Sequence, residues 1–363
     1  MKKIAIIHDW LVKMRGGEKV LESLCEIFKE AEIFTLIYDE KNISSLIKQK
    51  KINTSFLQNF LGIKKHYPFY LPLFPLAIEQ FNLKKFDLII SSSHCVAKGI
   101  IPHSDTCHIS YIYTPARYIW DFYFDHFENK NPFKKIFIPL IINYLRIWDV
   151  ISSYRVDYFI ACSEYIKMKI EKYYRKTSTV IYPPIDTSFF TPENVNENYY
   201  LIVSALTPYK KIDIAIKSFN KLNLPLIIIG NGSEQKKLKK MANKNIKFLN
   251  WQSNIEIKKY YAYAKALIFP MQEDFGISSL ESQSCGRPVI AYKKGGSLET
   301  IIENKTGIFF EEQNEDSLIE AVLKFQKMKF DKQKIREHSL TFDKEIFNQK
   351  FKNFVKEKTN FNL

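Results

Sequence analysis

The sequence predicts an α/β protein made of two doubly wound domains. Short apolar runs that are typical of buried strands alternate with helical patterns through both halves of the 363 residues, and this order gives parallel sheets covered by helices. Glycine pairs follow strands in both halves, at Gly16-Gly17 and Gly295-Gly296. The segment around Pro183-Pro184 cannot be helical and is the expected hinge. The length is sufficient for two such cores.

Composition narrows the class of protein. Apolar residues make up 46% and charged residues 26%, as in soluble globular proteins, and the net charge of +15 favours anionic partners. The five cysteines show no Cys-x-x-Cys spacing, so we expect neither a zinc site nor a disulfide framework. The first strand begins too early for a cleavable signal peptide, and no apolar run approaches a membrane span. We therefore expect a cytoplasmic protein, with peripheral contact to the inner face of the cytoplasmic membrane left open.

The first strand, at residues 3–8, leads to a loop and then to a helix that opens at Gly16-Gly17. Two glycines at a helix N-terminus let a phosphate approach bare backbone N–H groups. A plain tight turn is the alternative. The pattern lacks the G-x-G-x-x-G spacing of dinucleotide-binding proteins, which disfavours a dehydrogenase.

Two polar segments follow later strands of the first half. The strand at residues 86–91 ends in a Ser-Ser-Ser-His loop that carries His94, and residues 108–121 contain Tyr113 and Arg117. His94 is a candidate for the edge of a ligand site, and Arg117 is a candidate clamp for an anionic group. The alternatives are a structural histidine beside helix-capping serines and a surface ion pair.

In the second half, a strand at residues 199–204 leads to Lys210 and Lys211. Lys210 is placed to neutralise a diphosphate, although a single loop lysine is usually only solvated. Asp213 is expected to cap the helix that follows.

The most informative stretch is Glu273-Asp-Phe-Gly-Ile-Ser-Ser-Leu-Glu281, which follows a buried strand ending at Pro270. Glu273 is expected on the loop at the carboxyl end of that strand. Glu281 is expected more than a turn inside the next helix, near its positive end. Ligands bind at this edge of open α/β sheets. The alternative is an N-cap acid followed by a solvent-facing helix acid.

Glu273 and Glu281 with seven residues between them, Phe275-Gly276 and the later Gly286-Arg-Pro288-Val resemble the E-x7-E signature of retaining family-4 glycosyltransferases of the GT-B fold. The similarity runs along most of the chain and is strongest to the bacterial mannosyltransferase-like branch of surface polysaccharide synthesis. It implies two Rossmann-like domains facing a central cleft: an acceptor domain at residues 1–190, a nucleotide-sugar donor domain at 191–341, and a terminal helix at 342–363 that crosses back to the first domain.

The resemblance also implies roles for residues of this chain. Glu273 would be the catalytic residue that orients the transferred sugar, and Glu281 would bind the donor ribose. The remaining donor-binding residues would be Gly16, Gly17, Lys210, Lys211, Phe275, Gly276, Ile277 and Ser278, and the residues toward the sugar or acceptor would be His94, Tyr113 and Arg117. Tyr113 stands where the branch has a histidine, and Ala205 stands where the family commonly has an arginine. The tyrosine is expected to affect the sugar preference, and the alanine is expected to remove one of the two cations that usually neutralise the diphosphate.

The predicted reaction is transfer of a hexose, with mannose from GDP-mannose favoured by the branch, to a saccharide or lipid-linked saccharide. No cofactor is expected, and no metal, because the chain lacks an Asp-x-Asp pair. The alternatives are a GT-B sugar phosphorylase or epimerase and a non-enzymatic nucleotide- or nucleic-acid-binding protein. The lysines are scattered through both halves, which disfavours nucleic acid.

Two stretches, at residues 60–76 and 131–146, combine apolar side chains with lysine pairs. We expect them to form a rim that contacts an anionic membrane through Lys64, Lys65, Lys134 and Lys135. The alternative is a pair of core-facing helices with solvated lysines.

Overall fold

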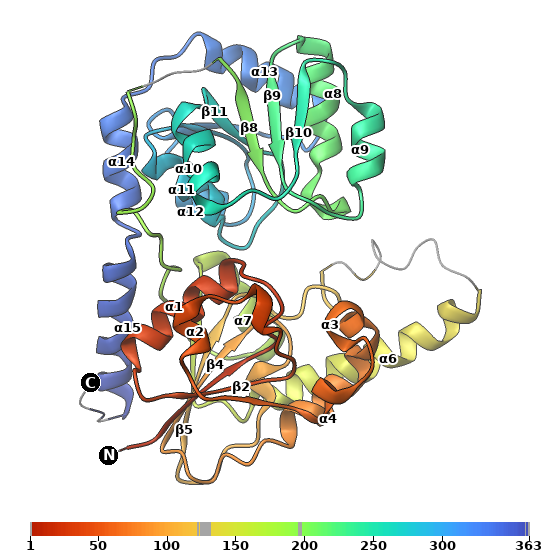
Figure 1. Ribbon diagram of the computed structural model, residues 1–363, viewed down its shortest axis with the longest axis vertical. Coiled ribbons are helices and arrows are strands. Elements are labelled where there is room, and N and C mark those ends of the chain that lie inside the picture. Colours follow the sequence, from red (N-terminus) through yellow and green to blue (C-terminus); the bar gives the residue numbers. More distant parts are fainter. Residues whose placement is uncertain (1, 122, 124–131, 195–197, 360, 362–363) are drawn as a thin grey trace. The chain divides into compact units, whose positions relative to one another are not determined.

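The computed structural model describes residues 2–121, 123, 132–194, 198–359 and 361, and for residues 132–136 it describes only the backbone. The chain divides into two compact units (Figure 1). Unit 1 comprises Met1–Tyr182 and Asn348–Leu363, and unit 2 comprises Pro183–Phe347. The division falls at the first proline of the Pro183-Pro184 pair, eight residues before the boundary expected at 190/191.

Unit 1 is built on a parallel sheet that has seven strands within the described residues, in the order β3-β2-β1-β4-β5-β6-β7. The strands are β1 Ile4–His8, β2 Glu32–Thr35, β3 Ile52–Thr54, β4 Leu88–Ser93, β5 Cys107–Ile112, β6 Tyr158–Ala161 and β7 Ser178–Val180. Strand β1 pairs in parallel with β2 on one side and with β4 on the other. The central strands are buried on both faces because helices cover the sheet on each side.

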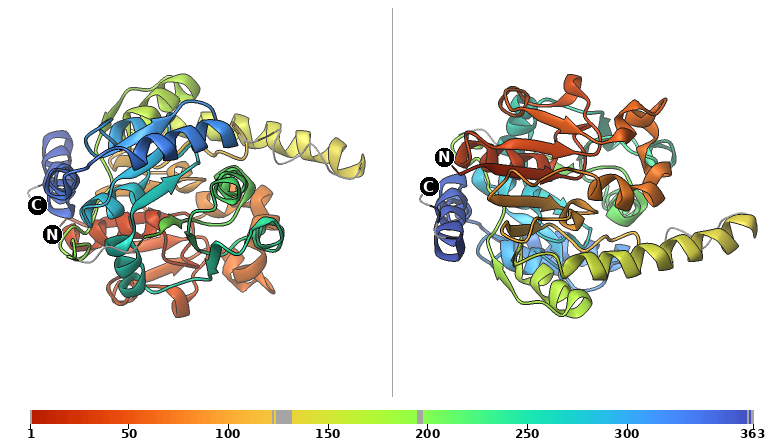
Figure 2. Two further views of the ribbon diagram at one scale, coloured as in Figure 1. Left: turned by 90° about the horizontal axis from the view of Figure 1, so that it is seen from above. Right: turned by 90° about the horizontal axis from the view of Figure 1, so that it is seen from below.

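The helices of unit 1 range from single turns to a long rod. They are α1 Gly16–Ile27, α2 Ser45–Lys48, α3 Ile63–His66, α4 Phe74–Glu79, α6 Pro132–Ser153 and α7 Glu164–Tyr174. Helix α6 runs along one side of the unit, and its N-terminal part extends past the neighbouring helices (Figure 2). The last helix, α15 Lys344–Thr359, begins in unit 2 with its first turn, and from Asn348 onward it belongs to unit 1.

Unit 2 repeats the design with six strands within the described residues, in the order β10-β9-β8-β11-β12-β13. The strands are β8 Tyr200–Val203, β9 Leu226–Ile229, β10 Ile246–Leu249, β11 Ala266–Phe269, β12 Val289–Tyr292 and β13 Gly307–Phe310. The helices are α8 Ile212–Leu222, α9 Gln235–Met241, α10 Asn254–Tyr263, α11 Ile277–Ser284, α12 Ser297–Thr300, α13 Glu315–Gln326 and α14 Lys332–Leu340. The prediction of two doubly wound α/β sheets is confirmed.

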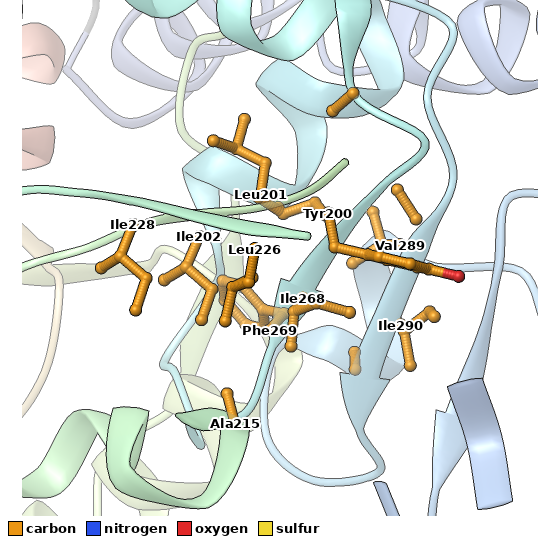
Figure 3. Packing of buried hydrophobic residues seen from close by; sticks show 14 of the residues in the cluster. Tyr200, Leu201, Ile202, Ala215, Leu226, Ile228, Ile268, Phe269, Val289 and Ile290 are labelled. Atoms are coloured by element: carbon orange, nitrogen blue, oxygen red, sulfur yellow. The ribbon is translucent and has the colours of Figure 1, made fainter. Parts of the chain in front are cut away.

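The core of unit 2 explains why its strands appear as unbroken apolar runs. Leu201 and Ile202 of β8, Ile228 of β9 and Ile268 of β11 are almost completely buried (Figure 3). Ala215 of α8 completes one side of this layer. Side chains on both faces of the sheet meet helices, so apolar residues occupy consecutive positions and do not alternate with polar ones.

One expected detail of unit 2 is wrong. Asp213 does not cap α8, because the residue at the N-cap is Lys211, whose backbone has the left-handed conformation (φ 53°). Asp213 lies in the first turn, where a carboxylate still interacts favourably with the helix dipole. The shift arises because a 3₁₀ turn, Pro208–Lys210, occupies the approach to the helix.

Candidate active site

The strand order locates one ligand-binding edge in each unit. In unit 2 the chain moves outward from β8 to β9 and β10, and then returns to β11 on the opposite side of β8. In unit 1 the same reversal lies between β1 and β4. The crevice outside the carboxyl ends of strands at such a reversal is where open α/β sheets bind ligands. The loops after β8, β11, β1 and β4 are therefore the candidate site loops.

In unit 2 these loops bring together two of the predicted residues. Lys210 ends the 3₁₀ turn after β8, and Glu273 lies on the loop after β11. The ammonium group of Lys210 forms an ion pair with Glu273, and the two side chains are only 13% and 15% exposed. The predicted cation and the predicted catalytic carboxylate thus lie side by side at the β8/β11 reversal.

Glu281 lies one turn inside α11, as predicted, and is nearly buried. Its Oε2 accepts a hydrogen bond of 3.1 Å from the hydroxyl of Tyr261 on α10. Burial and the charge of Glu281 raise the pKa of Tyr261 well above its usual range, so this phenol stays a donor. Tyr261 was not identified from the sequence, because only the fold brings α10 against α11.

The segment from Phe275 to Ser278 forms the entrance to α11. Gly276 is its N-cap with φ 104°, a conformation that favours glycine, and Ile277 and Ser278 open the helix half-buried. Phe275 is buried and its ring packs against Phe342. The backbone N–H groups at this helix start point along the dipole and suit oxygen-rich ligands.

The glycine loop after β12, at Gly295-Gly296, holds the backbone of Glu273. The N–H of Gly296 donates to the carbonyl of Glu273 (2.8 Å), and Gly295 forms a parallel bridge with the same residue. A Cβ atom on Gly295 would lie 2.4 Å from the Glu273 carbonyl oxygen. A Cβ atom on Gly296 would lie 2.4 Å from the Cα of Phe275. Glycine is required at both positions because the loop after β12 lies directly against the loop after β11.

In unit 1, Gly16 and Gly17 are the first two residues of α1, as predicted. The hydroxyl of Tyr113, which follows β5, donates to the carbonyl of Gly17 (2.9 Å) and also bonds the hydroxyl of Ser92 (2.7 Å). Ser92 in turn bonds His8 Nδ1 (2.9 Å). Tyr113 is therefore tied to the glycine loop, and burial raises the pKa of its phenol well above the usual range.

His94 is held by a buried carboxylate that the sequence did not single out. Asp9 is completely buried and accepts the backbone N–H groups of residues 94–97 at 2.6–3.1 Å. It also pairs with His94 Nδ1 at 3.0 Å. Burial opposes the charge on Asp9, but the ion pair and hydrogen bonds with His94 outweigh it and lower the pKa of Asp9 to about 2. Likewise, burial opposes the charge on His94 but Asp9 raises its pKa.

Two further charged or polar positions complete this edge of unit 1. Glu18 is buried in the first turn of α1, accepts the N–H of Arg15 (2.8 Å) and lies 3.7 Å from His8 Nε2. Burial opposes the charge on Glu18, but hydrogen bonding and charge from His8 lower its pKa. Arg117 is half-buried in the segment after β5. His8, Asp9 and Glu18 were missed, because only the pairing of β1 with β4 and the packing of α1 bring them to this edge.

The remaining candidates have simple placements. Lys211 follows Lys210 at the start of α8, and Ala205 is exposed on the loop after β8. In the described part of the chain, no group of three or more His, Cys, Asp or Glu side chains is placed to hold a metal ion.

Comparison with known proteins gives the family. Residues 15–189 match the family described as Glycosyltransferase Family 4, and residues 185–340 match Glycosyl transferases group 1. Together these matches cover most of the chain, which belongs to the family-4 retaining glycosyltransferases and has their GT-B fold.

Individual relatives are distant. An uncharacterized glycosyltransferase of Methanocaldococcus jannaschii is 30% identical over 172 residues, which are 46% of this chain and 49% of the relative. The O-antigen chain mannosyltransferase C of Escherichia coli is 24% identical over 262 residues, 68% of each chain. The chain thus spans about half the length of the first of these relatives.

Among solved structures, Anabaena HepE in complex with UDP and glucose superimposes with a TM-score of 0.72 at 17% identity. The match covers 98% of this chain and 99% of that chain. At this identity the likeness shows the fold, in agreement with the two doubly wound sheets.

Proposed function

We propose that this chain transfers a hexose, with retention of the anomeric configuration, from a nucleoside-diphosphate sugar to a saccharide or lipid-linked saccharide. The observation that carries the proposal is the meeting of Lys210 with Glu273 at the β8/β11 reversal, with the buried carboxylate of Glu281 one turn inside the helix that follows the Glu273 loop. A cation beside an acid, with a second acid on the adjoining helix, suits a ligand that has a diphosphate, a sugar and a ribose.

The roles follow from the chemistry of these groups. Lys210 stabilises the negative charge on the departing diphosphate, and Lys211 supplies a second cation nearby. Glu281, oriented by Tyr261, accepts hydrogen bonds from the ribose hydroxyls. Glu273 orients the transferred sugar and stabilises positive charge at its anomeric carbon. The acceptor attacks from the face that the diphosphate leaves, and a phosphate oxygen takes the acceptor proton.

Unit 1 supplies the complementary groups in this proposal. The backbone at Gly16 and Gly17 approaches the donor diphosphate, with the helix dipole of α1 favouring negative charge. His94, held by Asp9, and Arg117 act toward the sugar or acceptor. Tyr113 supports the glycine loop through its bond to the Gly17 carbonyl.

Mannose is the proposed sugar, supported by the likeness to the O-antigen chain mannosyltransferase C of Escherichia coli. That relative also supports a surface polysaccharide as the product class. GDP-mannose is the proposed donor because the sequence resembles the mannosyltransferase-like branch. Ala205 in place of the usual arginine leaves Lys210 and Lys211 to neutralise the diphosphate from this loop.

We also propose that unit 1 contacts an anionic membrane surface through the first of the two apolar, basic stretches. Leu61 is 97% exposed and Phe69 is 80% exposed, and the exposed Lys64 and Lys65 lie between them. Apolar side chains beside lysines are typical of interfacial elements. The side chains of Lys134 and Lys135 lie outside the described residues. None of the described helices is long and apolar enough to span a bilayer.

The decisive experiment separates donor binding from transfer. Thermal shifts with GDP, UDP, ADP and their sugar conjugates identify the nucleotide. Glu273→Gln is expected to retain that shift and lose at least about 100-fold in transfer rate, since an electrostatic contact to the reacting sugar is removed. Glu281→Gln is expected to weaken nucleotide binding about tenfold, a loss of about 1.4 kcal/mol. Full turnover by Glu273→Gln, or glycosyl transfer that consumes inorganic phosphate, would contradict the proposal.

A further inference from the structure

Helix α6 carries a stripe of exposed apolar side chains that the proposed reaction does not use. Within the described part of the helix and the residue just beyond it, the side chains are 47–65% exposed and recur in steps of three and four residues: Phe137, Leu140, Tyr144, Ile147, Ile151 and Tyr154. Figure 2 shows α6 on the outside of unit 1. We call this set the α6 stripe.

The α6 stripe is separate from the face that holds α6 to unit 1. Ile142 and Leu145 are buried against Ala116 and Ile119 on the opposite side of the helix. Asp149 is also buried there and forms an ion pair of 3.0 Å with Lys98. The helix therefore already has a complete core-facing side, and the α6 stripe is additional apolar surface.

Between residues 137 and 153, the described side chains beside the α6 stripe lack the exposed charges that a lipid-facing helix would carry. Besides the stripe itself, the exposed described positions from 137 to 153 are Pro139 and Asn143. Arg146 is turned inward, where its Nε donates to the carbonyl of Ile119 and its guanidinium lies over the ring of Trp120. Among the described side chains, Lys176 lies over the ring of Tyr154 at one end of the stripe. Lys134 and Lys135 lie in the helical turn before Phe137, at the other end, and their side chains are outside the described residues. Interfacial helices place Lys or Arg along their flanks, whereas no exposed cation lies among the described positions from 137 to 153, so a protein partner fits this part of the face better than a membrane does.

The spacing of the α6 stripe specifies the kind of partner. Steps of three and four residues give the 3.5-residue repeat of a seam between two packed helices. The sequence of steps reads the same from either end. An antiparallel second copy would therefore place Phe137 opposite Tyr154, Leu140 opposite Ile151 and Tyr144 opposite Ile147, and no stripe residue would lack a partner.

We propose that the α6 stripe is the contact surface of a two-fold symmetric homodimer in which two α6 helices pack antiparallel. The same patch serves both chains, as an isologous interface requires. Because the six stripe side chains are uncharged, two chains with a net charge of +15 can meet there without like charges at the centre of the contact. Six side chains that are about half exposed would bury roughly 600 Å² per chain, compared with about 800 Å² per partner in a standard interface.

The first test is oligomeric state by sedimentation velocity across a range of concentrations. The wild-type chain is expected to dimerise reversibly in the micromolar range, as suits a contact somewhat below standard size. Leu140→Glu with Ile151→Glu should raise the dissociation constant at least 100-fold, since both pairs of opposed positions would then carry like charges. The matched control is Ile255→Glu with Leu323→Glu, two exposed apolar positions of unit 2, which should dimerise like wild type.

The second test is the direction of pairing. Leu140→Cys and Ile151→Cys, prepared separately and mixed under mild oxidation, should give a disulfide between the two variants and little within either alone. The wild-type chain, with four buried cysteines and a partly buried Cys107, is the blank.

Three results would overturn the proposal. The first is a wild-type chain that stays monomeric at about 100 µM, roughly a hundredfold above the expected dissociation constant. The others are dimerisation that the double glutamate variant leaves unchanged, and disulfides that form within each single cysteine variant. Loss of binding to anionic liposomes by the stripe variant, with a monomeric wild type, would assign the face to lipid instead. None of these readouts depends on glycosyl transfer, so failure of the proposed reaction and failure of the dimer remain distinguishable.

Discussion

Gly296→Ala tests whether the loop after β12 positions Glu273. The backbone of Gly296 has φ −63°, which alanine adopts freely, so the substitution adds only the volume of one methyl group. That methyl carbon would lie 2.4 Å from the Cα of Phe275 and 2.6–2.7 Å from the carbonyl oxygens of Phe275 and Asp274. All three neighbours are backbone atoms, so the segment from Glu273 to Phe275 must move by roughly 1 Å to reach an ordinary carbon–carbon contact of about 3.5 Å.

The expected consequences differ for stability and for catalysis. Overpacking of this kind costs about 1–3 kcal/mol of folding free energy. A displacement of about 1 Å of a catalytic group costs on the order of 100-fold in rate. Gly296→Ala is therefore expected to lower the melting temperature by a few degrees and the transfer rate by about 100-fold, measured with saturating donor.

Gly62→Ala is the matched control. Gly62 has φ 71°, so alanine there costs about 1–2 kcal/mol of backbone strain. Its added methyl would meet only the flexible ring of His66, at 3.4 Å. It should destabilise the protein to a similar extent without changing turnover at a temperature where both variants are folded. A Gly296→Ala chain with wild-type turnover would refute the reasoning.

Two other outcomes are expected in unit 1. The folded pKa of Asp9 is about 2, against 3.8 for the free side chain, so Asp9 stabilises the fold by about 2 kcal/mol above pH 4, and this stabilisation is lost as the pH falls toward 2. The free energies of unfolding of wild type and Asp9→Asn, from urea titrations, should therefore differ by about that amount at pH 7 and converge near pH 2. A difference that stays constant with pH would contradict the assignment. Tyr113→Phe removes the hydrogen bond to the Gly17 carbonyl, which contributes about 1 kcal/mol, and should raise the KM for the nucleotide sugar about fivefold with kcat nearly unchanged. A large loss of kcat with unchanged KM would instead place the phenol at the reacting sugar.

The sequence was sufficient for features that depend on neighbouring residues. Gly16-Gly17 as a helix start, Glu273 on a loop and Glu281 one turn inside a helix are all confirmed. Each follows from a local pattern: an apolar run, a glycine and a helical repeat, which together fix where a strand ends and a helix begins.

Contacts between residues that are far apart in the chain could not be predicted from the sequence. Asp9 meets residues 94–97 only because β1 and β4 are neighbours in the sheet, and a buried acid after a strand looks like any loop acid until that pairing is known. The same holds for the bridge between Gly295 and Glu273 and for the hydrogen bond from the Tyr113 hydroxyl to the Gly17 carbonyl. The left-handed backbone of Lys211 was also unexpected, because nothing in the residue type favours it.

Helix α15 has a consequence for biosynthesis. Phe351 and Val355 are completely buried in unit 1, and Phe351 packs against Phe28 and Tyr111, more than 200 residues earlier in the chain. On the ribosome, unit 1 must therefore wait for residues made after the whole of unit 2, whereas unit 2 is continuous in sequence and can close first. A nascent chain that stops at Phe347 would leave the aromatic side chains of Phe28 and Tyr111 without the cover of Phe351, an apolar surface that chaperones and other unfinished chains can bind.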